Sequence, residues 1–172
     1  GLAGDLLVDG LVALALADRA DQDGCGAGGI KPQHRPLLAR RAGALIAAER
    51  SAQALDLSYK DGAELLTSAD LKADRLICEA IEKAFPEHHI LSEESSPELL
   101  DPAVLRAPLW VVDPIDGTVN YAYEHHQVAV SIAYAEGGQV RAGVVYCPFL
   151  DETFSARRGC GARLNGQPIR VG

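Results

Sequence analysis

Two aspartates, Asp113 and Asp116, follow an apolar run in the segment WVVDPIDGT. A cluster of anionic oxygens at the end of a strand is costly unless a cation neutralises it. Hard divalent cations do so, because Mg²⁺ prefers carboxylates, a carbonyl oxygen and retained waters. The spacing therefore indicates a metal site, and a phosphate is the substrate that such a site suits.

A second acidic pair, Glu93 and Glu94, follows another short apolar run at positions 90–92. Two strands that both end in acids can converge on one cation cluster. On the residues alone an alternative stays open: the glutamates belong to a solvated loop, and Asp113 only caps a turn, as in most Asp-Pro dipeptides.

The elements around the aspartates follow from local chemistry. Residues 109–112 predict a short buried strand because they are continuously apolar and partly β-branched. Pro114 cannot continue a hydrogen-bonded ladder, so the strand is expected to end at Asp113. Gly117 allows the backbone to approach a ligand closely, and Thr118 can open a helical turn.

Two helices are predicted upstream. The first starts near Pro36, and its other face carries arginines. Its apolar stripe is Leu38, Ala42, Leu45 and Ile46, and its arginines are Arg40, Arg41 and Arg50. The second helix follows Thr67 or Ser68 as its cap and ends before Pro86, with a clean apolar stripe over residues 73–84. Asp70 lies in its first turn, where a carboxylate also stabilises the helix dipole.

The second half of the sequence favours antiparallel strands. Residues 127–135 and 139–146 alternate around a Gly137-Gly138 turn, which predicts a hairpin. Short strands are expected at 153–156 and 169–171, and a loop with a short helix after Glu94. Helices followed by strands imply an α+β fold, with helices packed on a largely antiparallel sheet.

Residues 1–33 are interpreted as an N-terminal extension outside the catalytic fold, which would occupy 36–172. Residues 2–20 have a weak helical pattern, and 21–29 read as a Gly-rich linker by composition. The Asp-x-Asp-Gly start of that linker lacks the distal glutamate of a calcium loop.

Composition agrees with a cytoplasmic enzyme. The chain has 172 residues, 48% of them hydrophobic, which is enough to bury one core. Its net charge of −8 argues against nucleic-acid binding, whereas bound cations would still let it hold a phosphate monoester. The apolar run 11–17 is too short to cross a membrane, and the scattered cysteines favour reduced thiols over disulfides.

Several motifs together resemble the inositol monophosphatase family of magnesium-dependent, lithium-sensitive-type phosphatases. The signature segment 113–118 is joined by Asn120 and Tyr121. The other matching blocks, in order, are Lys60 with 65–70, Glu93-Glu94-Ser95, 128–133, 143–148 with Asp151, and 159–166. The resemblance implies the N-terminal half of a layered α/β/α/β/α sugar-phosphatase fold.

Two departures bear on completeness and substrate. The family continues into a second half, whose Trp-Asp-x-Ala motif completes the second metal site, and no Trp-Asp pair occurs in this chain. His126 stands where inositol-phosphatase-like members usually carry proline, at the border of the substrate mouth.

The resemblance assigns roles residue by residue. Magnesium would be held by Glu93, Asp113, the carbonyl of Ile115 and Asp116, with Asp113 bridging two ions. Thr118 and Asp70 would form a hydrogen-bonded pair that takes a proton from the attacking water, while Glu94 orients waters at the rim. On chemical grounds, the amides of Gly117 and Thr118 would also bind phosphate. Lys60 either lies in an outer shell beside the acidic cluster or is an exposed loop lysine.

The leading hypothesis is Mg²⁺-dependent hydrolysis of a small phosphate monoester, most simply inositol 1-phosphate, by a homodimer. Histidinol phosphate, fructose 1,6-bisphosphate and nucleotide 3′-phosphates remain alternatives within the family. A different class of function also stays open: a catalytically incompetent half that binds metal or a partner protein. The pairs His88-His89 and His125-His126 are not favoured as zinc ligands, because hard oxygen ligands dominate the site.

Overall fold

A seven-stranded sheet forms the centre of the molecule in the computed structural model, which describes residues 34–52, 57–60, 64–95 and 101–170. Strands β3 to β9 lie side by side in sequence order, with only β3 and β4 parallel. Their bounds are β3 (His89–Ser92), β4 (Leu109–Asp116), β5 (Ala129–Glu136), β6 (Gln139–Cys147), β7 (Glu152–Arg157), β8 (Gly161–Leu164) and β9 (Gln167–Ile169).

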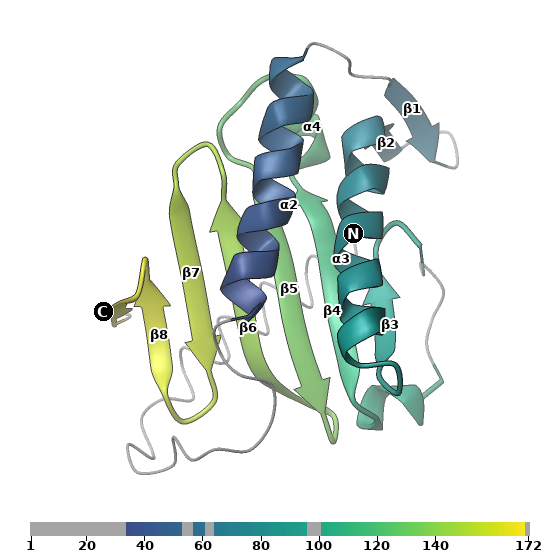
Figure 1. The fold of residues 1–172 in the computed structure, drawn as a ribbon, viewed down its shortest axis with the longest axis vertical. Coiled ribbons are helices and arrows are strands. Elements are labelled where there is room, and N and C mark those ends of the chain that lie inside the picture. The colour runs from purple at the N-terminus through teal and green to yellow at the C-terminus, as the bar shows by residue number, and fades with distance from the viewer. Residues whose placement is uncertain (1–33, 53–56, 61–63, 96–100, 171–172) are drawn as a thin grey trace.

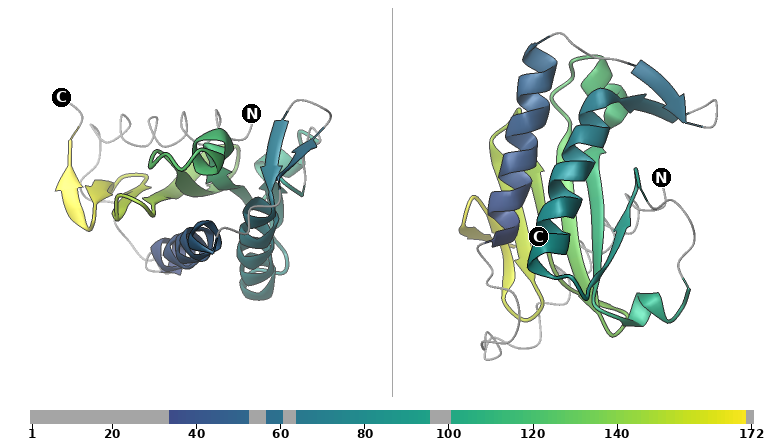
Figure 2. Two further views of the ribbon diagram at one scale, coloured as in Figure 1. Left: turned by 90° about the horizontal axis from the view of Figure 1, so that it is seen from above. Right: turned by 45° about the vertical axis from the view of Figure 1, so that its right-hand side comes forward.

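Two long helices cover one face of this sheet (Figures 1 and 2). They are α2 (His34–Ser51) and α3 (Ser68–Ala84), and they pack against each other as well as on the sheet. The short elements are the hairpin β1 (Leu57–Lys60) and β2 (Glu64–Thr67), the 3₁₀ turn η2 (Val104–Arg106) and α4 (Thr118–Ala122). The predicted α+β architecture is confirmed.

The core lies between the helices and the sheet. Both predicted helical stripes face it, although Leu38 and Leu45 are only partly buried. The fully buried side chains include Ile46 and Ile77 from the helices and Trp110, Val112, Val130 and Ile132 from the sheet. Burial of this apolar stripe, rather than helix propensity alone, holds the helices on the sheet.

Helix α2 approaches β6 closely at Gly43. A Cβ built there would lie 2.4 Å from the ring of Tyr146. We expect Gly43→Ala to destabilise the chain by about 1–3 kcal/mol, because the clash outweighs the better helix propensity of alanine. Thermal unfolding measures this loss of stability, and Ala44→Gly on the exposed side of the helix is the control for helix propensity. An unchanged melting temperature for Gly43→Ala would contradict the close contact.

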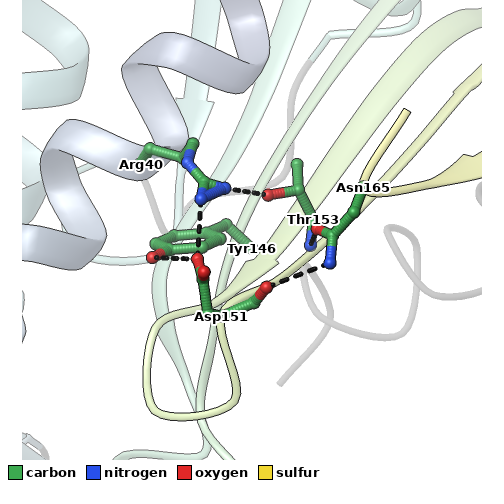
Figure 3. A network of polar contacts seen from close by, with 5 residues as sticks. All are labelled: Arg40, Tyr146, Asp151, Thr153 and Asn165. Atoms are coloured by element: carbon green, nitrogen blue, oxygen red, sulfur yellow. Dashed lines mark hydrogen bonds and ion pairs between the residues drawn. The ribbon is translucent and has the colours of Figure 1, made fainter. Parts of the chain in front are cut away.

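A polar network ties the outer side of α2 to the far strands (Figure 3). Arg40 donates to Thr153 at 2.9 Å and pairs with Asp151 at 2.6 Å, while its guanidinium lies over the ring of Tyr146. Asn165 accepts from the amide of Thr153 and donates to the carbonyl of Asp151. Arg40 therefore packs against β6, β7 and the turn that joins them, which the helical pattern alone did not indicate.

The prediction that the 109–112 strand ends at Asp113 is wrong. Strand β4 continues through the buried Pro114 to Asp116. Asp113 pairs with Ser131, and Asp116 pairs with Ala129, so β4 has one more residue than β5 in this interval. Such a bulge accommodates proline, because the extra residue needs no ladder hydrogen bond.

Other elements partly match the sequence predictions. The hairpin predicted from residues 127–135 and 139–146 is confirmed as the antiparallel pair β5 and β6, and β7 contains the expected 153–156 strand. The last strand ends at Ile169 instead of running from 169 to 171, and the hairpin β1–β2 and strand β8 had not been predicted. The interpretation of residues 1–33 lies outside the described residues. Within the described ranges, none of the helices combines the length and apolarity needed to cross a bilayer.

Candidate metal and phosphate site

Asp113 is the centre of the candidate site. It is 2% exposed, and its Oδ1 atom is buried without a hydrogen-bond partner. Burial, followed by the charges of Glu93 and Asp116, raises the pKa of Asp113 to about 8. A carboxylate in this environment favours either a proton or a cation at neutral pH.

The parallel pairing of β3 and β4 brings the two acidic strand ends together. Ser92 pairs with Val112, so the next residues, Glu93 and Asp113, are neighbours, and the Glu93 amide donates to the Val112 carbonyl at 3.2 Å. A hydrogen bond from Glu93 and the charge of Glu94 also contribute to the raised pKa of Asp113. The two acidic strand ends therefore lie side by side, while the expectation that they converge on one cation cluster stays a prediction.

This cluster does not form a ready metal cage. Across residues 34–52, 57–60, 64–95 and 101–170, no three His, Cys, Asp or Glu side chains stand in metal-binding proximity. Glu93 and Asp113 instead share a hydrogen bond. The ligand set Glu93, Asp113, Ile115 and Asp116 therefore stays a prediction.

The bulge in β4 shapes the turn that follows Asp116. Gly117 has φ of 92°, and a Cβ there would lie 2.9 Å from the carbonyl oxygen of Gln127. Asn120 donates to the same carbonyl at 2.9 Å, which fixes the loop after α4 against the turn. Glycine at 117 thus satisfies both the left-handed backbone and the close approach.

Asp70 and Thr118 are in contact, as the sequence resemblance predicts. The Thr118 hydroxyl lies 3.2 Å from Asp70 Oδ1 and 3.1 Å from the Ile115 carbonyl oxygen. The Thr67 amide donates to Asp70 Oδ2 at 2.8 Å and the Asp70 amide donates to the Thr67 hydroxyl oxygen at 3.4 Å, which forms a capping box. The Thr67 hydroxyl also donates to Asp70 Oδ2 at 2.5 Å. Burial raises the pKa of Asp70, while these hydrogen bonds oppose the rise.

A buried contact between α3 and β3 was missed at the sequence level. The Ser92 hydroxyl donates to Asp74, and both side chains are buried. Asp74 lies four residues after Asp70, on the same face of α3, and this spacing is the signal that could have found it. The contact fixes α3 against β3, the strand that Glu93 directly follows.

Two candidates are placed less fully. Lys60 ends β1, where its backbone pairs with Glu64, but its side chain is outside what the structure describes. His126 is exposed and stacks on Phe149 at 6.1 Å. Arg50 lies over the same Phe149 ring and donates to the His125 carbonyl, so this histidine pair belongs to a packed loop beside α4.

Comparison with known sequences gives a consistent result. A profile described as the inositol monophosphatase family matches residues 34–172. A fructose-1,6-bisphosphatase/inositol-1-monophosphatase of Thermotoga maritima is 42% identical over 108 residues, which are 63% of this chain and 40% of that protein. Inositol monophosphatase 1 of Rattus norvegicus is 35% identical over 136 residues, which are 78% and 49% of the two chains. The Nus factor SuhB of Escherichia coli is 40% identical over 134 residues, or 77% and 49%.

Solved structures agree with the sequence matches. An IMPase of Thermotoga maritima superposes with a TM-score of 0.70 at 37% identity, over 80% of this chain and 52% of that one. The suppressor protein SuhB of Bartonella henselae gives 0.71 at 36% identity, over 79% and 52%. The chain thus spans about half the length of the relatives that it matches.

Proposed function

Because this chain belongs to the inositol monophosphatase family, we propose that its acidic cluster binds Mg²⁺ and takes part in hydrolysis of a small phosphate monoester. The observation that carries the proposal is the buried, unpartnered Oδ1 atom of Asp113 at the meeting point of two acidic strand ends. Phosphatase chemistry is shared by relatives whose names include inositol-1-monophosphatase.

The donor set fits a hard divalent cation. Glu93, Asp113 and Asp116 would supply carboxylate oxygens, and Ile115 would supply a backbone carbonyl in the bulge of β4. These oxygen donors suit Mg²⁺, which binds oxygen ligands and keeps several of its own waters. When bound, the cation supplies positive charge that stabilises the developing charge of a phosphoryl transition state.

The chain's own residues would handle the proton. Thr118 bridges between Asp70 and the Ile115 carbonyl, which places a hydroxyl between the acidic cluster and a second carboxylate. Its single proton can be donated to one acceptor at a time. We propose that Thr118 donates to Asp70 during the reaction and accepts a proton from the attacking water, so that Asp70 is the final base.

The remaining roles concern orientation. Glu94 is half-buried beside the cluster and would order water at its rim. The amides of Gly117 and Thr118, directly after the acidic turn, would donate to phosphate oxygens. Lys60, which ends β1 of the hairpin β1–β2, would supply a positive charge that limits repulsion among the carboxylates of the cluster.

Inositol 1-phosphate is the first substrate to test, with histidinol phosphate, fructose 1,6-bisphosphate and adenosine 3′,5′-bisphosphate beside it. We expect phosphate release that requires Mg²⁺ and stops in EDTA. Glu136→Gln, an exposed acid at the end of β5, is the matched control and should behave as the unaltered chain.

Phosphate release, measured together with Mg²⁺ binding, separates the two classes of function. Saturable Mg²⁺ binding without phosphate release would support a metal-binding half over a complete phosphatase. Neither binding nor release from a folded sample would contradict both. On the family resemblance we also propose a cytoplasmic homodimer, and light scattering of the purified chain would measure its mass.

A further inference from the structure

A second concave surface lies on the far strands of the sheet. It has a volume of about 530 Å³ and is lined by the first turn of α2, β6 and the strands β7 to β9. None of the residues assigned to the acidic cluster lines it, and β5 separates β4 from β6 in the sheet. It is therefore a site apart from the one proposed above.

Among the described residues that line this surface, every charged side chain is basic. The described residues that line it include no aspartate or glutamate. They include four arginines, Arg35, Arg157, Arg163 and Arg170. This concentration stands out in a chain of net charge −8, and a cleft of one sign of charge attracts ions of the opposite sign.

Arg35 is the most constrained of the four. It lies in the first turn of α2, is only 8% exposed, and its Nη1 atom is buried without a hydrogen-bond partner. Burial, followed by the charge of Arg157, lowers its pKa. A buried guanidinium N–H group without a hydrogen-bond partner is costly, because it has lost its water without replacing it.

The position of Arg35 on the helix adds to this cost. A cation in the first turn lies at the positive end of the helix dipole, and the first turn of α2 carries no acidic residue. An anion bound beside Arg35 would offset both the helix dipole and the positive charge of this buried guanidinium, whose Nη1 atom has no partner. Guanidinium groups match phosphate oxygens in geometry as well as charge, through paired N–H···O hydrogen bonds.

We propose that this arginine-lined surface is a second anion site, which binds a doubly charged tetrahedral oxyanion such as inorganic phosphate or the phosphate of a monoester. Arg35 is its buried anchor, and Arg163 and Arg170 supply charge at its exposed rim. The proposal does not depend on magnesium or on turnover at the acidic cluster.

Binding of inorganic phosphate to the full chain in EDTA tests the proposal, by calorimetry and ³¹P NMR. In EDTA the acidic cluster repels phosphate, so the binding that remains belongs to the arginine site. We expect saturable binding of one phosphate and a higher melting temperature on its addition. Arg35→Gln should weaken binding by about tenfold or more, since it removes a charge-assisted contact.

Three control variants separate the possible outcomes. Arg41→Gln removes an exposed charge from the same helix outside the site and should bind as the unaltered chain. Glu136→Gln, which removes an exposed acid outside the site, should also leave binding unchanged. Arg163→Gln tests the rim independently if Arg35→Gln does not fold, and it should weaken binding less than loss of the anchor.

Two arms define the ligand. Glycerol 2-phosphate should compete with phosphate if the site accepts a monoester, and failure to compete would restrict it to the free ion. Equal competition by acetate would overturn the preference for a tetrahedral dianion. Absence of saturable phosphate binding, or an equal loss with Arg41→Gln, would overturn the site itself.

Discussion

Replacing Asp113 with asparagine is expected to lower Mg²⁺ affinity by at least about 100-fold, since loss of an outer-shell partner alone costs about 10–100-fold. Asparagine keeps the shape of the side chain but removes the charge that Glu93, Asp116 and the bulged strand surround. Calorimetric titration of Mg²⁺ measures the change. Glu136→Gln removes one exposed negative charge and should bind as the unaltered chain, so equal losses in both variants would point to net charge instead of a site.

The pH dependence of binding follows from the same carboxyl. Its pKa is raised to about 8, so at pH 6 a cation must displace a proton, whereas above pH 8 it need not. Mg²⁺ affinity should therefore rise about tenfold per pH unit up to pH 8 and level off above it. Over the same pH range the number of protons released on Mg²⁺ binding should fall toward zero, which calorimetry in buffers of different ionisation enthalpy measures. Asp113→Asn should abolish both the rise in affinity and the proton release.

The stability of the metal-free chain should fall as pH rises, whereas its Mg²⁺ affinity should increase. Between the ordinary pKa of 3.8 and about 8, folded Asp113 holds a proton that the unfolded chain has lost. This contribution to stability is fully present below the unfolded pKa and is lost as pH rises through 8. In EDTA the melting temperature should thus fall from pH 6 to pH 9 in the unaltered chain and fall less in Asp113→Asn.

The acidic cluster could be predicted from sequence because each of its parts has a local signal. Two apolar runs that end in acids predict two strands with acidic ends, and parallel pairing of Ser92 with Val112 is all that is needed to join them. Asp70 was also within reach, because Thr67 and Asp70 have the spacing of a capping box.

The parts that sequence reasoning missed depend on long-range packing. Whether Pro114 ends β4 or enters a bulge depends on how β5 pairs beside it, and no local pattern encodes that pairing. Arg35 reads as one basic residue at the start of a helix, and only the fold places β7 to β9 around it. The role of His126 likewise depends on Phe149, a residue distant in the sequence.

Substitution of Asp70 with asparagine is expected to reduce Mg²⁺-dependent phosphate release by about 10²–10⁴-fold, the usual contribution of a general base. Thr118→Ala should also reduce Mg²⁺-dependent phosphate release, because it removes the hydroxyl that connects Asp70 to the acidic cluster. Neither change alters the proposed carboxylate ligands. Thr118→Ala removes a hydrogen bond to the Ile115 carbonyl but leaves that oxygen in place, so Mg²⁺ affinity should stay within a few-fold of the unaltered chain. Loss of Mg²⁺ binding in Thr118→Ala would show that its role has been misassigned.

A measurement on Asp70 itself tests this pair without relying on turnover. The hydrogen bonds from Thr67 and Thr118 stabilise the charged carboxylate and so oppose the burial that raises its pKa. Thr118→Ala removes one of these donors, and the pKa of Asp70 should therefore rise further, which ¹³C NMR of the carboxyl group reports directly. Thr118→Ser keeps the donor and should restore the pKa of the unaltered chain. If Thr118→Ala still turns over, the acidic limb of its pH–rate profile should move to higher pH, because a larger fraction of Asp70 is then protonated at a given pH. An unmoved limb would mean that Asp70 is not the base.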